Sequence, residues 1–260
     1  MEYIFASDPH GTGQAWIDLV NQAKEKYPSS TLIFGGDYID GRDQCLETVN
    51  FVNEQETQGA KVLFGNHEDM MVNFVEYDDD LWLFNGGRTT IRSLLGNDFD
   101  RQQARRRLAE NEYYLWIKNH YNSLIFETER MVFVHAGINT NNQPVNRNYK
   151  LWARQEYWYG NKKKERLNEI FAHNQTEKVI ITGHTPTYLL KGVLEDPVPE
   201  GQFEIIGYAD IDYSCPVVKV QYLHEEARYF TDGGCHGQWP GHHGNVCVFD
   251  SGGELIDVYH

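Results

Sequence analysis

KVLFGNHED (residues 61–69) joins a short apolar run to a predicted turn that carries Asn66, His67, Glu68 and Asp69 in succession. A short apolar run that ends at a glycine is typical of a buried strand. Polar residues after such a strand commonly form only the turn, so this stretch leaves two interpretations open. Asn66 and His67 are either turn residues or functional groups at the carboxyl end of a strand.

Four further apolar runs end in the same way, on a glycine or turn residue followed by a potential metal ligand. They are YIFA (3–6) before Asp8 and His10, TLIF (31–34) before Asp37, MVFV (131–134) before His135, and VIIT (179–182) before His184. Helices are predicted between the runs at 14–26, 44–56 and 101–118. This alternation predicts an α/β sheet with parallel strands, whose ligands bind beyond the carboxyl ends of the strands.

The remaining segments predict further layers. The stretch 77–120 contains no clear strand and is expected to be a helical cap. After residue 200 the chain shows short strand-like runs joined by turns, which predict a second, more antiparallel sheet: FEIIGYADIDY, PVVKVQYLH, ARYFTD, NVCVFD and ELIDVY. The aromatic stretch YKLWARQEYWY (149–159) is expected to be a helix packed in the core, with a platform for a nucleobase or a tyrosine ring near Arg154 as the alternative. The lysines of NKKKER (161–166) are expected to form a solvated face.

Composition limits the class of protein. A chain of 260 residues suits one large domain or two small ones. A formal net charge of −15 disfavours binding to nucleic-acid backbones or anionic membranes. The four cysteines (Cys45, Cys215, Cys235 and Cys247) form no C-x-x-C pair, which favours a reduced, cytoplasmic protein. We expect neither a signal peptide nor a membrane span, because no stretch approaches about 20 apolar residues.

The potential ligands at the strand ends form one set of oxygen and nitrogen donors: Asp8, His10, Asp37, Asn66, His135 and His184. Each residue alone is more often a hydrogen-bonded turn residue than a ligand, but together they favour a metal site. Carboxylate, amide oxygen and imidazole suit divalent Mn, Fe or Zn, and the absence of thiolates argues against structural zinc. Six ligands exceed the needs of one open catalytic ion and predict two ions sharing one carboxylate, about 3.5–4 Å apart.

The strand-end motifs, taken in order, resemble those of the calcineurin-like metallophosphoesterases, especially the bacterial and phage branch of the phosphoprotein phosphatase family. They are SDPHG (7–11), GDYIDGR (36–42), GNHED (65–69), HAGI (135–138) and GHTPT (183–187), and the resemblance includes NGGRTT (85–90), LWAR (151–154) and DGGC (232–235). The resemblance implies a single αββα domain over residues 1–260, with two mixed β-sheets packed as a sandwich, flanking helices and a cap-like insertion around 77–120.

The same resemblance implies a role for each site residue. Asp8 and His10 would bind the first ion, Asp37 would bridge both ions, and the second ion would be bound by Asn66, His135 and His184. His67 would be the general acid, with Asp40 as its orienting partner. Arg42 and Arg154 would hold phosphate oxygens. The implied reaction is phosphomonoester hydrolysis by a metal-activated hydroxide, with manganese as the expected metal and iron or zinc as alternatives.

Departures from the family pattern bear on the substrate. Ser7 replaces the usual glycine, Arg42 follows Gly41 instead of preceding it, and Phe64 stands where many members have an arginine. Weaker binding of phosphate is therefore expected. The expected substrate is phosphoserine, phosphothreonine or phosphotyrosine in a protein. A dinucleoside polyphosphate, which NGGRTT also suggests, is the alternative, and a catalytically inactive binding module is disfavoured by the complete ligand set.

Three residues near the end of the chain keep alternative interpretations. Asp232 is either a hydrogen-bond acceptor behind the metal ligands or a turn residue at a strand end. His242 and His243, in WPGHHGN (239–245), are expected at the surface, with a substrate contact as the lesser alternative. The expected partner is a phosphorylated protein or nucleotide.

Overall fold

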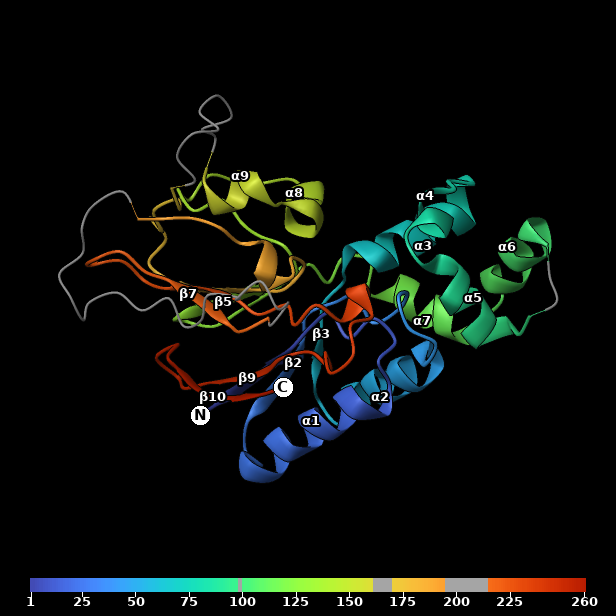
Figure 1. The fold of residues 1–260 in the computed structure, drawn as a ribbon, viewed down its shortest axis with the longest axis horizontal. Helices are drawn as coiled ribbons and strands as arrows, with labels where there is room; N and C mark the ends of the chain where they lie inside the picture. Colours follow the sequence, from blue (N-terminus) through green and yellow to red (C-terminus); the bar gives the residue numbers. More distant parts are fainter. Residues whose placement is uncertain (98–99, 161–169, 195–214) are drawn as a thin grey trace.

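The computed structural model describes residues 1–97, 100–160, 170–194 and 215–260. In these ranges the strands form two five-stranded sheets, shown as stacked arrows in Figure 1. The first sheet has the order β10-β9-β1-β2-β3, with β1 (Tyr3–Ala6), β2 (Thr31–Phe34), β3 (Lys61–Val62), β9 (Val246–Phe249) and β10 (Leu255–Tyr259). The second has the order β4-β5-β6-β8-β7, with β4 (Ile125–Glu127), β5 (Met131–Val134), β6 (Val179–Thr182), β7 (Val218–Val220) and β8 (Arg228–Phe230).

Both sheets are mixed, with parallel strands beside antiparallel ones. In the first sheet β1, β2 and β3 are parallel, whereas β9 and β10 run antiparallel to their neighbours. In the second sheet β5, β6 and β8 are parallel, and the edge strands β4 and β7 are antiparallel. Each sheet therefore gathers the carboxyl ends of three parallel strands along one edge, where ligands commonly bind.

Alternating residues of the central strands enter different cores, which explains why these runs are apolar throughout. In β2, Ile33 lies in the core between the sheets, while Leu32 and Phe34 lie in the core on the outer face of the first sheet. In β6, Ile181 faces the inter-sheet core and Ile180 the outer face of the second sheet. Successive strand side chains point to opposite faces, so a strand buried on both faces needs apolar residues at every position.

Helices cover both outer faces of the sandwich (Figure 1). α1 (Gln14–Lys26) and α2 (Cys45–Thr57) lie against the first sheet. α1 buries Trp16, Val20 and Ala23, and Leu19 is partly buried against the same core. On the other side lie α8 (Arg147–Trp152) and α9 (Gln155–Trp158), with Tyr157 and Trp158 packed in the outer core of the second sheet.

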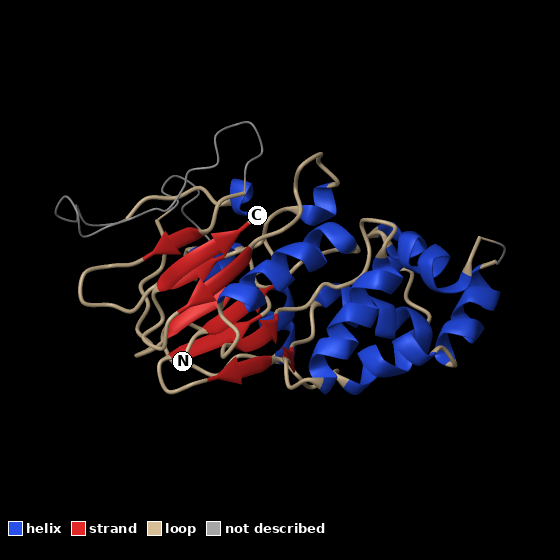
Figure 2. Cartoon of the chain, turned by 90° about the horizontal axis from the view of Figure 1, so that it is seen from below, coloured by secondary structure: helices blue, strands red, loops and turns tan. Residues whose placement is uncertain are grey.

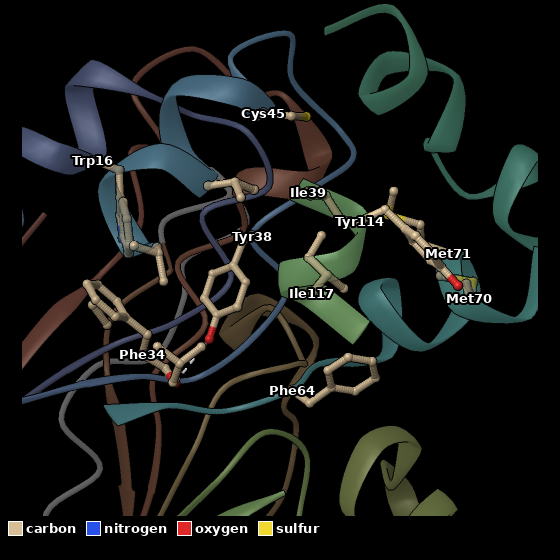
Figure 3. Close-up of a cluster of buried hydrophobic side chains, with 14 of the residues drawn as sticks. Trp16, Phe34, Tyr38, Ile39, Cys45, Phe64, Met70, Met71, Tyr114 and Ile117 are labelled. Atoms are coloured by element: carbon tan, nitrogen blue, oxygen red, sulfur yellow. Dashed lines mark hydrogen bonds between the residues drawn. The ribbon is translucent and has the colours of Figure 1, made fainter. Parts of the chain in front are cut away.

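A group of helices stands beside the sheets (Figure 2) and comprises α3 (Asn66–Tyr77), α4 (Leu81–Phe84), α5 (Gly87–Leu95), α6 (Arg101–Ala109) and α7 (Glu112–Asn119). Its apolar residues continue the core of the first sheet, and Figure 3 shows Met70, Met71, Tyr114 and Ile117 in that cluster. That these helices form an insertion in a single domain stays a prediction. No helix among the described residues has the length and apolar character needed to cross a bilayer.

Most predicted elements are confirmed, and four are corrected. The helix expected at 101–118 is two helices, because Asn111 caps α7 by accepting hydrogen bonds from the backbone N–H groups of Tyr113 and Tyr114. The helix expected at 149–159 is likewise divided into α8 and α9. The strands described after residue 215 form no separate sheet, since β7 and β8 join the second sheet and β9 and β10 the first.

The run KVLF also contributes less strand than expected, because β3 ends at Val62. After it the chain turns toward the helical group, where the backbone N–H of Phe64 donates to the carbonyl of Ser123 at 2.8 Å. Two expected features, the strand FEIIGYADIDY and the lysines of NKKKER, lie outside the described residues.

The packing of the inter-sheet core can be tested at Phe133, which lies in β5. Its ring centroid lies 5.6 Å from that of Phe5 and 6.4 Å from that of Phe249, so it joins both sheets. Phe133→Ala is expected to lower the free energy of unfolding by about 3–5 kcal/mol, measured by urea denaturation. Phe84→Ala is the control, because Phe84 is 83% exposed and should change stability by less than about 0.5 kcal/mol. Equal effects of the two substitutions would contradict this packing.

Candidate metal centre

The predicted ligands lie where the parallel strands of the two sheets end. Asp8 follows β1, Asp37 follows β2, His135 follows β5 and His184 follows β6. The backbone N–H of His184 donates to both carboxylate oxygens of Asp8, at 2.9 and 3.0 Å, and so joins the ends of β1 and β6. The two sheets therefore contribute to one site.

Several site residues have left-handed backbone conformations, which are uncommon for residues other than glycine. The φ angles are 54° for Asp8, 44° for His10, 57° for Asp37, 71° for Asp40 and 68° for His184. These five are among only nine such non-glycine residues in the described part of the chain. Strained backbone of this kind concentrates at functional sites, because the surrounding structure holds it in place.

Two glycines allow the strand ends to approach each other closely. A Cβ atom on Gly65 would lie 2.2 Å from Oδ1 of Asp37, and one on Gly183 would lie 2.0 Å from Oδ2 of Asp8. Any side chain at either position would displace a carboxylate. The glycines of GNHED and GHTPT are thus required by the packing of the site.

Two groups of potential ligands share Asp37. The first contains Asp8, His10 and Asp37, and the second contains Asp37, His135 and His184; within each group the ligand atoms lie within 4.8 Å of one another. Oδ2 of Asp37 is 3.6 Å from Nε2 of His10, and Oδ1 is 3.5 Å from Nε2 of His135. Two neighbouring groups joined by one carboxylate match the arrangement of two-metal sites.

The tautomers of His10 and His135 leave one unprotonated ring nitrogen on each residue, and this atom can bind a cation. Nδ1 of His10 lies 3.1 Å from the carbonyl of Ile39, and Nδ1 of His135 lies 2.8 Å from that of Gly35. A carbonyl only accepts, so each Nδ1 carries the proton and each Nε2 presents a lone pair. Nε2 of His135 faces an oxygen of Asn66 at 2.9 Å, an arrangement that a cation between the two atoms would stabilise.

Buried charge gives a second, independent indication. Burial is the main cause that raises the pKa of Asp8 and Asp37 well above their usual values, and neighbouring carboxylates raise them further. Burial likewise raises the pKa of Glu68 and of Asp232 to about 7. Four carboxylic acids buried together without a balancing cation are unfavourable in the ionised form. The donor set thus fits divalent metal ions.

His184 also has the properties of a metal ligand, because both of its ring nitrogens are buried without a hydrogen-bond partner among the described residues. Burial, followed by the charges of His135 and Arg154, lowers its pKa well below the usual value and favours neutral imidazole. Neutral imidazole is the form that binds a metal ion.

His67 and Asp40 form a buried pair beside these ligands. Nδ1 of His67 lies 2.6 Å from Oδ2 of Asp40, and the backbone N–H of His67 donates to Oδ1 of Asp37 at 2.9 Å. Burial raises the pKa of Asp40 to about 8, and hydrogen bonds from the Thr90 hydroxyl and from the Trp82 indole, at 2.8 Å, oppose that rise. These donors stabilise the ionised carboxylate and hold it against His67.

The two arginines expected at the phosphate lie in different surroundings. Arg154 stands between α8 and α9, donates from Nη1 to the Thr185 hydroxyl at 3.1 Å, and after burial is the second cause that lowers the pKa of His67, to about 3. Arg42 instead donates to backbone carbonyls, including that of His242 at 2.7 Å. These bonds hold Arg42 against the end of the chain, and its phosphate role stays a prediction.

The structure adds site residues that the sequence analysis did not identify. Glu68 accepts hydrogen bonds from the backbone N–H groups of Asp37 at 2.8 Å and Tyr38 at 2.9 Å, and its position three residues after Gly65 was an available helix-capping signal. Trp82 and Thr90 carried no such signal. His236 packs on His10 and His67, with ring centroids 4.7 and 5.0 Å apart, directly after DGGC.

The remaining expected residues can also be placed. Asp232 is buried, accepts a hydrogen bond from the backbone N–H of Gly234 at 2.8 Å, and contributes to the raised pKa of Asp8. Asp232 therefore accepts a hydrogen bond from the backbone just after the end of β8, and it also lies near enough to the metal ligands to affect Asp8. His242 and His243 are half-buried and line a cavity of about 440 Å³, and their expected surface position stays a prediction.

Comparison with known protein families identifies the class of this chain. The family model for calcineurin-like phosphoesterases matches residues 1–215, and the chain belongs to that family. It is therefore a metal-dependent phosphoric ester hydrolase whose site uses divalent metal ions. The curated proteins contain no match.

Solved structures similar to the chain include a metallophosphoesterase from Sphaerobacter thermophilus (11% identity, 100% of this chain and 90% of that chain, TM-score 0.49). Another is the cold-active protein-tyrosine phosphatase of a psychrophile, Shewanella sp. (16% identity, 98% and 76%, TM-score 0.46). A third is a protein serine/threonine phosphatase from Saccharomyces cerevisiae (12% identity, 100% and 80%, TM-score 0.43).

Proposed function

We propose that this phosphoesterase hydrolyses phosphomonoesters with two divalent ions, manganese being the proposed metal. The ligands would be Asp8 and His10 for the first ion, Asp37 for both, and Asn66, His135 and His184 for the second. The observation that carries the proposal is the pair of ligand groups that share Asp37, beside the hydrogen-bonded pair of His67 and Asp40. The two ligand groups would hold metal ions that bind phosphate and activate a nucleophilic water, and the pair of His67 and Asp40 would protonate the leaving group.

Bound metal ions would neutralise phosphate charge and lower the pKa of a bound water toward neutrality. The residues of the chain supply the rest. Asp40 holds Nδ1 of His67, which fixes the tautomer and stabilises an imidazolium that carries a proton on Nε2. His67 donates this proton to the departing alkoxide, which is a poor leaving group without it. Arg154 binds and orients phosphate oxygens through its planar guanidinium.

A phosphomonoester, in particular phosphorylated serine, threonine or tyrosine in a protein, is supported by the distribution of positive charge. Arg154 contributes to the lowered pKa of His67, His135 and His184, so its charge acts on the site. Arg42 uses three donors on backbone carbonyls. A dinucleoside polyphosphate carries several charged phosphates and would need more cationic side chains than these residues provide.

The proposal is tested by a substrate panel assayed with manganese. The panel holds p-nitrophenyl phosphate, phosphoserine and phosphotyrosine peptides, bis-p-nitrophenyl phosphate and diadenosine tetraphosphate. We expect kcat/KM to be highest for the monoesters. A preference for diadenosine tetraphosphate would replace the proposed substrate class, and hydrolysis of none of these esters would overturn the function.

Arg154→Ala tests the phosphate contact. The variant is expected to raise the inhibition constant of inorganic phosphate by about 10- to 100-fold, because it removes a charge-assisted hydrogen bond, while metal content stays that of the unmodified protein. Arg130→Ala is the matched control: Arg130 pairs with Glu226 at the exposed surface, so its loss changes net charge equally. An unchanged inhibition constant for Arg154→Ala would exclude the role.

A further inference from the structure

Arg42 and the segment 235–242 form a unit that the reaction described above does not use. Nε of Arg42 donates to the carbonyl of Cys235 at 3.2 Å, and Nη2 donates to those of Trp239 at 3.2 Å and His242 at 2.7 Å. In return, the side-chain amide of Gln238 donates to the carbonyl of Gly41. The planar fork of arginine suits several acceptors in fixed positions, so Arg42 holds this segment against the turn that carries Asp40.

The segment places His236 at the opening of the site. The His236 ring lies 4.7 Å from that of His10 at an angle of 71°, and 5.0 Å from that of His67 at 53°. His10 and His67 are buried, whereas His236 is exposed, so it lies between the proposed general acid and solvent. Among the described residues, the His236 ring forms one hydrogen bond, a long one, with Nε2 3.5 Å from the carbonyl oxygen of Asn85.

We propose that His236 binds the alcohol portion of the phosphoester beside His67 and so helps to set leaving-group specificity, and that Arg42 positions it by holding segment 235–242. The inference rests on the proposed function, because it extends the site in which His67 protonates the leaving group. An imidazole N–H can donate to the carbonyl groups that flank a phosphoserine in a peptide. The bonds to carbonyl groups give Arg42 a function that does not require contact with phosphate.

The arrangement assigns different parts of the substrate to different residues. Arg154 lies beside α9 and the ligands of the second group, whereas His236 lies beside His67 and His10. Inorganic phosphate has no alcohol portion, so it should depend on Arg154 and not on His236. A phosphopeptide should depend on both.

The test compares kcat/KM for a phosphoserine peptide with the inhibition constant of inorganic phosphate, in manganese. His236→Ala is expected to lower kcat/KM about 10- to 100-fold, the value of a hydrogen bond to a substrate, while changing the phosphate inhibition constant less than about twofold. His260→Ala, which removes another exposed histidine, should change neither quantity. Retention of two manganese ions by His236→Ala would show that it is not a metal ligand.

Arg42 is tested through its dependence on His236. Arg42→Ala should lower peptide kcat/KM by a similar factor, and the double variant with His236→Ala should lose no more than the larger single loss. Arg42→Lys should behave like Arg42→Ala, because lysine keeps the charge but lacks the fork; retained activity would instead favour a direct charge contact. Gln238→Asn shortens the side chain that donates to the carbonyl of Gly41 and should give a smaller loss of peptide kcat/KM. This variant tests the position of segment 235–242 if Arg42→Ala does not fold.

The outcomes separate this inference from the proposed function. Unmodified protein that hydrolyses none of the phosphomonoesters would overturn both. Active unmodified protein, with full peptide activity in His236→Ala or with equal losses of peptide and phosphate binding, would overturn the role of His236 alone. Additive losses in the double variant would overturn the positioning role of Arg42.

Discussion

His67→Asn is expected to lower kcat for alkyl phosphates by about 10²–10⁴-fold, the usual contribution of general acid catalysis. The physical reason is the 2.6 Å contact between Nδ1 of His67 and Oδ2 of Asp40, which holds the imidazole in place as the proton donor. p-Nitrophenyl phosphate should lose much less, because its leaving group needs little protonation. Asp40→Asn should give a milder loss in the same direction.

A matched control for His67 exists elsewhere in the chain. Nε2 of His120 lies 2.7 Å from Oε1 of Glu56 and forms a similar histidine–carboxylate pair outside the site. His120→Asn should leave kcat unchanged on both substrates. Equal losses on both substrates for His67→Asn, together with a lost metal ion, would identify His67 as a ligand and contradict its role as acid.

Asp37→Asn is expected to reduce kcat by more than about 10⁴-fold, beyond the effect of losing the general acid alone, because both ligand groups share this carboxylate. Metal binding offers a separate readout. Manganese should raise the Tm of the unmodified protein by binding only the folded state, and this rise should be largely lost in the variant.

In the absence of metal, Asp37→Asn should leave the folded protein at least as stable as the unmodified protein. Burial and the neighbouring Glu68 and Asp8 raise the pKa of Asp37, so its ionised form is unfavourable without cations. Removing that charge should not lower the Tm of metal-free protein. Asp43→Asn, at an exposed position, is the control for both experiments. Unchanged activity and an unchanged response to manganese in Asp37→Asn would contradict the shared-ligand arrangement.

The sequence was most informative where local pattern and tertiary structure coincide. YIFA, TLIF, MVFV and VIIT form strands with the predicted bounds, because residues buried on both faces of a sheet must be apolar throughout. Asp8, Asp37, His135 and His184 follow from the same logic, since each stands within three residues of the end of such a strand. Asn66 instead begins α3, four residues after the end of β3. The structure brings these residues together, and their metal-binding roles remain a proposal.

Features that depend on packing between distant segments could not be predicted from local pattern. Trp82 and Thr90 reach Asp40 only because α4 and α5 pack beside the turn at Asp40. The apolar residues of β7 and β9 indicate that each is a strand but not which sheet it joins. The direction of Arg42 depends on carbonyl groups about 200 positions later in the chain, which no local pattern contains.

The most direct test of the two-metal site is the number of manganese ions bound per chain. Metal-free protein is titrated with manganese, and elemental analysis after removal of free metal is combined with anomalous scattering from crystals. We expect two ions, one at Asp8 and His10, one at His135 and His184, with Asp37 between them, and loss of hydrolysis on chelation. One ion or none at saturating manganese, with full hydrolysis of a phosphomonoester, would contradict the proposed mechanism.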